Sequence, residues 1–469
     1  MSDFRIEHDL LGERPVPAAR YYGIQTLRAV ENFSITGIPI AHYPRLVQAL
    51  AYIKKAAAQA NQELGLLDPD LANAICAACD EILAGRLLEE FVVDVIQGGA
   101  GTSTNMNANE VIANRALELL GHHKGEYQFL HPLNHVNLSQ STNDVYPSAL
   151  RLALSLKMDG LRREMERLQA SFRAKGHEFH TVIKMGRTQL QDAVPMTLGQ
   201  EFEAWAVMIG EDVQRLVEAQ SLIREINLGA TAIGTGLNAH PEYARLVTAR
   251  LRQLTGVALL MAPNLVEATQ DAGAYVQLSG VLKRIAVKLS KICNDLRLLS
   301  SGPRAGLGEI NLPPMAPGSS IMPDKVNPVI PEVVNQVAFE VIGNDITVTM
   351  AAEAGQLELN AFEPVIAYSL FRSLDMLGRA CRTLAERCID GITANHEHTR
   401  RMVEQSIGLV TALNPVIGYE KSTEIARLAL ITDRSVYDIV LEKGYLSKAE
   451  LDDLLSPENM THPRYIQSQ

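Results

Sequence analysis

The segment of residues 317–328, PGSSIMPDKVNP, combines residue types that can perform chemistry. Its glycine and prolines disfavour regular helix, so it is predicted to form a loop ahead of the helical run that follows. Two adjacent hydroxyls, Ser319 and Ser320, precede Lys325 in this loop. Serine is a poor base unless its alkoxide is stabilised, which backbone amides and a nearby ammonium can do. The segment therefore predicts an anion site or a serine base beside a helix N-terminus.

Five more short segments share one chemistry, being rich in Gly, Ser, Thr, Asn and Gln and poor in charge. They are residues 98–110, 137–147, 186–195, 227–238 and 300–306. Neutral hydroxyls, amides and free backbone N–H groups bind oxygen-rich small molecules by geometry. A turn with helix caps explains any single segment equally well. Because all six segments interrupt a helical pattern, together they favour a small-molecule site at adjoining helix ends.

Several familiar catalytic and binding motifs are absent from the sequence. It contains no G-x-x-x-x-G-K-[ST], no H-E-x-x-H and no G-x-S-x-G. Its histidine pairs, 122–123 and 396/398, have no cluster of Cys or carboxylate residues around them, so no metal-binding residues are predicted. The glycines of GATAIGTG follow no clear strand and are weak evidence for dinucleotide binding.

The composition is that of a folded protein: 47% of the 469 residues are apolar and 21% are charged. A net charge of −11 argues against nucleic acid or an anionic membrane as the main partner. Five cysteines without framework spacing are typical of reduced thiols. The N-terminal stretch lacks the apolar region of a signal peptide, and no apolar run is long enough for a membrane span. We therefore expect a cytoplasmic protein.

Long amphipathic helices must position the polar segments. Apolar residues recur at steps of four and three from Leu154 to Phe172, and again from Leu278 to Leu299. Such lengths predict a long helical bundle, shared between subunits, in an all-α fold. No strand-rich region is expected beyond a short hairpin near residues 4–40. Further helices are predicted at 44–64, 71–83, 196–225, 333–355, 364–389, 423–431, 435–443 and 448–455.

The residues GSSIMPDKVNP (318–328) resemble the signature GSSxMPxKxNP of the aspartase/fumarase superfamily. Similar segments follow in family order over nearly the whole chain, among them GGAGTSTNMNANE, QSTNDVYP and KMGRTQLQDAVPMTLGQE. The segment AAEAGQLELNAFEP, residues 351–364, resembles the aspartate ammonia-lyases more closely than the class II fumarases.

The resemblance implies an all-α homotetramer with a central bundle of five long helices from each subunit, and active sites shared between three subunits. The domains expected are residues 1–142, mainly helical; 143–397, the long-helix bundle with loop 317–328; and 398–469, a small helical domain. The implied reaction is reversible β-elimination of L-aspartate to fumarate and ammonia. No cofactor is required by this chemistry, and activation by Mg²⁺ is left open.

Site residues follow from the resemblance one position at a time. Ser319 matches the catalytic base, and Ser320 its neighbour that contacts substrate. Lys325 and Asn327 match residues that bind one substrate carboxylate. The remaining substrate contacts are matched by Thr102, Ser141, Thr142, Asn143 and Thr188. We expect the neutral donors Ser141, Thr142, Asn143 and Thr188 to hold the β-carboxylate while Ser319 removes the C3 proton.

Two positions depart from the family pattern. Gln189 stands where fumarases and some aspartases have histidine, which argues against a histidine-assisted hydratase. Asp324 stands where a small residue is usual, and its carboxylate beside Lys325 could weaken anion binding or alter loop opening. Two other functions stay open at this stage: a class II fumarate hydratase, and a catalytically silent helical scaffold.

Overall fold

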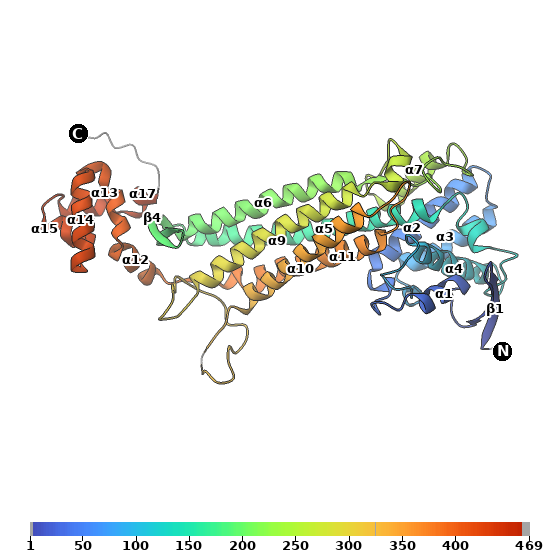
Figure 1. The fold of residues 1–469 in the computed structure, drawn as a ribbon, viewed down its shortest axis with the longest axis horizontal. Coiled ribbons are helices and arrows are strands. Elements are labelled where there is room, and N and C mark those ends of the chain that lie inside the picture. Colours follow the sequence, from blue (N-terminus) through green and yellow to red (C-terminus); the bar gives the residue numbers. More distant parts are fainter. Residues whose placement is uncertain (1–2, 324, 462–469) are drawn as a thin grey trace. The chain divides into compact units, whose positions relative to one another are not determined.

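Helices dominate the computed structural model, which describes residues 3–323 and 325–461 (Figure 1). The predicted all-α class is confirmed. Contacts within the chain group the residues into two compact units. Unit 1 comprises Met1–Arg162, Gln214–Ala286 and Phe339–Leu377, and unit 2 comprises Arg163–Val213, Val287–Ala338 and Gly378–Gln469. The predicted domain boundaries at residues 142 and 397 remain a prediction.

Long helices contribute residues to both units. They are α5 (Thr142–Glu178), α6 (Leu198–Ile223), α9 (Gly273–Leu299), α10 (Val329–Glu353) and α11 (Glu363–Arg387). Side-chain hydrogen bonds join neighbouring helices within unit 1: Gln220 of α6 donates to the Ser155 carbonyl of α5, and Ser279 of α9 donates to Asp345 of α10. In unit 2, Lys288 of α9 donates to the Met208 carbonyl of α6.

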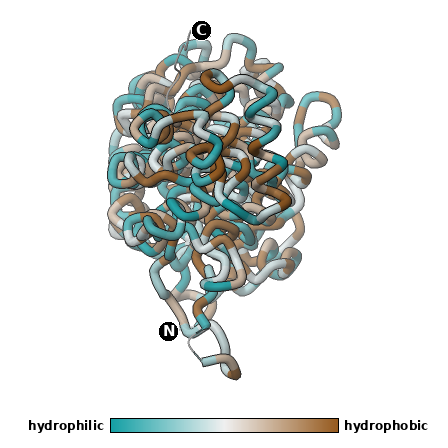
Figure 2. Tube along the Cα trace, turned by 90° about the vertical axis from the view of Figure 1, so that its left-hand side faces the viewer, coloured by the Kyte–Doolittle hydropathy of each residue, from teal (hydrophilic) through white to brown (hydrophobic). Residues whose placement is uncertain are grey.

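The predicted heptad stripe of α5 is buried along its whole length. Leu154, Met158, Leu161, Met165, Leu168 and Phe172 are each at most 2% exposed. Residues of the stripe on α9 are buried in the same way, Leu299 being the most exposed at 5%. Figure 2 shows the resulting alternation of hydrophobic and hydrophilic residues along the trace. The stripes therefore form the core, as the periodicity predicts.

Unit 1 also contains the N-terminal helices. The predicted hairpin is confirmed as β1 and β2, and the predicted helices at 44–64 and 71–83 are confirmed as α2 and α3. The bounds are β1 (Phe4–Asp9), β2 (Gly12–Pro17), α1 (Ile24–Asn32), α2 (Pro44–Glu63), α3 (Pro69–Leu83), α4 (Thr102–Leu119), β5 (Glu225–Ile226), α7 (Tyr243–Thr255), β6 (Leu260–Met261) and α8 (Leu265–Gln270). Most of segment 98–110, expected to interrupt the helical pattern, instead forms the first half of α4. Its asparagines are buried there because neighbouring backbone and side-chain groups bond them.

Unit 2 holds a second hairpin, formed by β3 (Ile183–Thr188) and β4 (Gln191–Thr197). The sequence analysis did not predict this hairpin, which lies outside residues 4–40. The turn residues Gln189 and Leu190 both have positive φ, at 53° and 63°. Asn-Gly or Asp-Gly normally marks such a turn, so this sequence lacked the usual signal.

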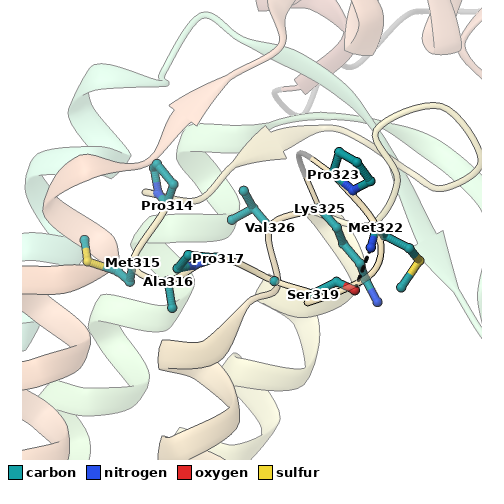
Figure 3. A pocket seen from close by; sticks show the side chains of 10 residues that line it. Pro314, Met315, Ala316, Pro317, Ser319, Met322, Pro323, Lys325 and Val326 are labelled. Atoms are coloured by element: carbon teal, nitrogen blue, oxygen red, sulfur yellow. Dashed lines mark hydrogen bonds between the residues drawn. The ribbon is translucent and has the colours of Figure 1, made fainter.

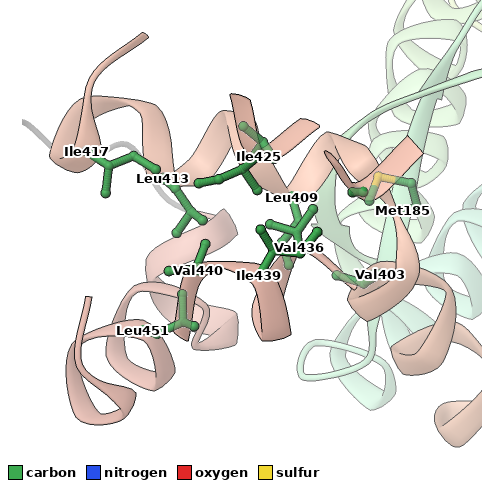
Figure 4. Close-up of a cluster of buried hydrophobic side chains, with 12 residues drawn as sticks. Met185, Val403, Leu409, Leu413, Ile417, Ile425, Val436, Ile439, Val440 and Leu451 are labelled. Carbon is green, nitrogen blue, oxygen red and sulfur yellow. The ribbon is translucent and has the colours of Figure 1, made fainter. Parts of the chain in front are cut away.

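The C-terminal part of unit 2 is a set of short helices around its own core. They are α12 (His396–Gln405), α13 (Val410–Ile417), α14 (Tyr419–Thr432), α15 (Val436–Glu442), α16 (Lys448–Leu454) and α17 (Pro457–Thr461), preceded by the paired strands β7 (Ile310–Asn311) and β8 (Thr393–Ala394). Figure 4 shows Leu413, Ile439 and Val440 in this core with Met185 of β3. The predicted cap Ser447 forms a full capping box with Glu450 at the start of α16.

Candidate active site

Ser319 lies on an exposed loop between β7 and α10, in unit 2. Its Oγ accepts hydrogen bonds from the backbone N–H groups of Ile321, at 3.1 Å, and Met322, at 3.0 Å (Figure 3). Two amide donors on one hydroxyl oxygen stabilise its anionic form. The local fold of the loop therefore supplies what a serine base needs.

A ring of hydrogen bonds closes the loop at its base. The Gly318 N–H donates to the Lys325 carbonyl at 2.7 Å, and Asn327 Nδ2 donates to the Gly318 carbonyl at 2.7 Å. A Cβ atom on Gly318 would lie 2.2 Å from the Lys325 oxygen, so only glycine fits there. Asn327 keeps one N–H and its Oδ1 for another partner.

The loop encloses a cavity of about 440 Å³. Ser319, Met322 and Lys325 line it together with residues 314–318, Pro323 and Val326 (Figure 3). The Lys325 side chain is exposed and makes no hydrogen bond or ion pair within the described residues, and Ser320 is exposed beside it. Asp324, singled out from the sequence, lies outside the described residues. The cavity thus combines a candidate base with an unpaired cation.

Ser141, Thr142 and Asn143 form the start of α5 in unit 1. The Ser141 Oγ accepts from the Asn143 N–H at 3.2 Å, and the Ser141 N–H donates to Asp144 Oδ1 at 3.0 Å. This reciprocal cap fixes the first turn of the helix. Asn143 Nδ2 donates to the Ala232 carbonyl at 2.7 Å, which leaves its Oδ1 as an acceptor.

Four amide side chains and one lysine support the triplet from within unit 1. We call this group the amide cluster, and it consists of Lys54, Asn105, Asn109, Asn137 and Gln140. Asn105 Nδ2 donates to Thr142 Oγ1 at 3.1 Å and to Asn137 Oδ1 at 3.2 Å. Lys54 Nζ donates to Asn137 Oδ1 at 2.8 Å and to Gln140 Oε1 at 2.9 Å. Thr142 thus accepts from the cluster, and its hydroxyl hydrogen stays available.

Lys54 is the most unusual member of the amide cluster, because its side chain is fully buried. Burial lowers the pKa of its ammonium group to about 7. The sequence analysis missed Lys54 and the rest of the cluster. A lysine within the alanine-rich helix YIKKAAAQAN was the available signal, because a charged residue on a buried helix face needs polar partners.

The other predicted substrate residues lie at element ends. Thr102 is the first residue of α4 in unit 1, where its hydroxyl donates to the Gly99 carbonyl at 2.8 Å and keeps its lone pairs free. Thr188 is the exposed last residue of β3 in unit 2. In the described part of the chain, no hydrogen bond joins Thr188 to loop 317–328. Nor does any described group of three His, Cys, Asp or Glu residues stand ready to hold a metal ion.

The predicted site residues therefore form three groups. Thr102 and the triplet 141–143 belong to unit 1, whereas Thr188 on its hairpin and the loop with Ser319 belong to unit 2. Among residues 3–323 and 325–461, no helix is both long enough and apolar enough to cross a membrane.

Comparison with known proteins gives close matches. Residues 12–343 match a family model described as lyase, and residues 409–462 match one described as fumarase C C-terminus. An aspartate ammonia-lyase of Helicobacter pylori is 62% identical over 459 residues, with 98% of each chain covered. A crystal structure titled fumarate lyase:delta crystallin, from Brucella melitensis and bound to cobalt, superposes with a TM-score of 0.96 at 60% identity, covering 98% of this chain and 100% of that one. A class II fumarase of Schistosoma mansoni has a TM-score of 0.94 at 36% identity, with the same coverage.

Proposed function

The chain belongs to the lyase family of aspartate ammonia-lyases and fumarases, and from this premise we propose that Ser319 is its general base. The reaction is that of a carbon–nitrogen lyase, an aspartate ammonia-lyase, which eliminates ammonia from L-aspartate to leave fumarate. The observation that carries the assignment of the base is the pair of backbone N–H groups on Ser319 Oγ. Identity of 62% with an aspartate ammonia-lyase, against 36% with a class II fumarase, favours ammonia over water as the leaving group.

The difficult step is removal of the C3 proton next to the β-carboxylate. Ser319, as the alkoxide, takes this proton, and the C–H electron pair moves into the carboxyl group, which then carries a second negative charge. Hydrogen-bond donors that meet this charge lower the barrier if they bind it better than they bind the ground state. Ser141 and Thr142 suit this role, since their oxygens already accept bonds and their hydroxyl hydrogens are free. Thr188 adds a third hydroxyl from its hairpin.

The leaving amine needs acceptors rather than donors. Asn143, expected from the sequence to donate to the β-carboxylate, offers its Oδ1 to the amine instead, because its Nδ2 already donates to the Ala232 carbonyl. Thr102 offers oxygen lone pairs, because its hydroxyl hydrogen is committed to Gly99. The electron pair returns from the carboxyl group to form the C2=C3 bond, the C–N bond breaks, and neutral ammonia leaves.

Lys325 and Asn327 bind the other carboxylate of the dicarboxylate substrate, with Ser320 as a further contact. The Lys325 ammonium lines the loop cavity without a partner among the described residues, and Asn327 retains one N–H after closing the loop. Because Ser319, Lys325 and Asn327 share one loop, its movement onto the substrate would exclude water and align the base in one step.

The working form is a homotetramer in which three subunits contribute to each active site. Phe339, Ile346 and Met350 follow one another on α10 at steps of seven and four, and they are 62%, 58% and 66% exposed. A heptad stripe of this kind is buried when helices of other copies pack on it. Light scattering after size exclusion should give the mass of four chains, and Ile346→Lys should lower it. A monomeric wild type would contradict the shared site.

We place the enzyme in the cytoplasm. All five cysteines are free thiols, and four of them are buried. Buried unpaired thiols suit a reducing compartment.

The direct test follows fumarate by its absorbance after mixing the protein with L-aspartate and, separately, with L-malate. Product from aspartate alone is expected. Ser319→Ala should reduce kcat by about 10³-fold or more, because no other group takes the C3 proton. Ser221→Ala, an exposed serine on α6, is the matched control and should behave as wild type. Product from malate alone would show a hydratase, and near-normal turnover by Ser319→Ala would remove Ser319 from the mechanism.

A further inference from the structure

Residues 227–232, part of the polar segment NLGATAIGTGLN, have no place among the predicted substrate contacts, yet they cross the start of α5. Four hydrogen bonds tie them there. Asn143 Nδ2 donates to the Ala232 carbonyl at 2.7 Å, and Asn227 Nδ2 donates to the Asn143 carbonyl at 3.0 Å. The N–H groups of Gly229 and Thr231 both donate to Asp144 Oδ2 at 3.0 Å. The side chain and the backbone of Asn143 are therefore both held by this segment.

Asp144 is the central group of this arrangement. It is fully buried, and its carboxylate takes three backbone N–H groups: Ser141 on Oδ1, and Gly229 and Thr231 on Oδ2. One oxygen caps α5, and the other fixes residues 227–232, which we call the crossing segment. Two of the four hydrogen bonds that place the Ala232 carbonyl relative to Asn143 are therefore made by one carboxylate.

The backbone of the crossing segment is held in a conformation that its residues do not favour. Thr231 has φ +58°, rare for a β-branched residue, and its buried Oγ1 finds no partner in the described chain. Gly229 has φ +97°, and a Cβ there would lie 2.5 Å from the Ala244 Cβ. Strain of this kind persists only where the surrounding structure enforces it, and it concentrates at functional sites.

We propose that Asp144 is a positioning residue for amine recognition, acting through residues 227–232 on the amide of Asn143. Its carboxylate fixes the backbone of residues 227–232. The Ala232 carbonyl in this segment then accepts a hydrogen bond from Asn143 Nδ2, and Asn143 Oδ1 is left to accept from the substrate ammonium. This inference rests on the proposed function of Asn143.

The test compares a ligand that has the amine with one that lacks it. Asp144→Asn replaces one carboxylate oxygen by an amide nitrogen, which cannot accept an N–H. The KM for L-aspartate should then rise by about ten-fold or more, whereas the inhibition constant of succinate, a dicarboxylate without an amine, should change by less than about three-fold. If Asp144 had a purely structural role, Asp144→Asn would weaken the binding of L-aspartate and succinate alike, or of neither.

Asp94 supplies a matched control in the same unit. It is a buried carboxylate that accepts the N–H groups of Thr36, Gly37 and Ile96 and contacts none of the predicted substrate residues. The Asp94→Asn variant should be less stable than wild type, but its KM for L-aspartate and its inhibition constant for succinate should be unchanged.

Asn227→Ala covers the case in which Asp144→Asn fails to fold. It removes only the bond to the Asn143 carbonyl and those to Ser148 and Thr269, and should raise the KM for aspartate by a smaller factor, again more than it changes the succinate constant. Equal effects on aspartate and succinate, or none in a folded variant, would overturn the inference. Inactivity of the wild type towards aspartate would instead overturn the proposed function.

Discussion

Ser319 lies on an exposed loop whose described residues form hydrogen bonds only within residues 318–332. Thr142, by contrast, accepts a hydrogen bond from buried Asn105 of the amide cluster. In the proposed mechanism the two regions serve one reaction with different demands. A base on a loop can move onto the substrate, and its own two N–H donors move with it. Donors for the developing charge work best when their orientation is fixed beforehand, which a buried network provides. If this contrast is correct, variants of the loop should change kcat or KM with little loss of stability, and variants of the cluster should change both substrate binding and stability.

Gly318→Ala should have the largest effect among the variants that keep Ser319. The new Cβ would collide with the Lys325 carbonyl and open the hydrogen-bonded ring, which displaces the base. A displacement of about 1 Å costs roughly 10²-fold in kcat. The melting temperature should hardly change, because the loop contributes little to the core. Gly160→Ala, at a helical glycine with open space around it, is the control and should be neutral. A normal kcat for Gly318→Ala would show that the ring does not position Ser319.

Asn105→Ala tests the other side of the contrast. Asn105 is buried and supports Thr142, so its loss should raise the KM for aspartate by about ten-fold and lower the free energy of unfolding by about 1–3 kcal/mol. Steady-state kinetics and urea denaturation measure the two effects.

Asn107→Ala is the control for this pair of effects, since Asn107 lies on the same helix and is equally buried. Its amide bonds the backbone of Glu90 and Val92 instead of a substrate residue. It should therefore lose stability without a change in KM. If both variants leave KM unchanged, the amide cluster supports only the fold.

Lys325→Ala should raise the KM for aspartate by about ten-fold and lower kcat less, because it removes the unpaired cation of the cavity but leaves Ser319 and its N–H donors in place. Urea denaturation should show no loss of stability. Lys448→Ala, an exposed lysine of α16, serves as the control. An unchanged KM would exclude Lys325 from carboxylate binding.

The same contrast explains what could be predicted from the sequence. The long helices follow from local periodicity, and loop 317–328 from its prolines, glycine and paired serines. The amide cluster was missed because Lys54 and Asn137 meet across 83 positions, a contact that no local pattern encodes. The hairpin of β3 and β4 was missed for another reason: Gln189 and Leu190 adopt a left-handed turn that neither residue type favours. Both failures concern places where tertiary packing overrides local preference.

The smallest expected effect is a pH dependence of stability that arises from Lys54 in the amide cluster. Burial lowers the pKa of Lys54 from its ordinary value of 10.5 to about 7 in the folded state. Between these values the unfolded chain binds a proton that the folded chain does not, so stability from this group is complete above pH 10.5, falls as the pH drops towards 7, and is constant below. The advantage of wild type over Lys54→Met in urea denaturation should therefore shrink from pH 9.5 to pH 7. Burial also raises the pKa of Asp144 from 3.8 to about 7, at the lower edge of this window, but both proteins contain Asp144, so the comparison is between proteins that share its titration. Parallel stability curves for the two proteins would mean that Lys54 keeps its proton in the folded state, and the amide cluster would then be built around a buried ammonium ion.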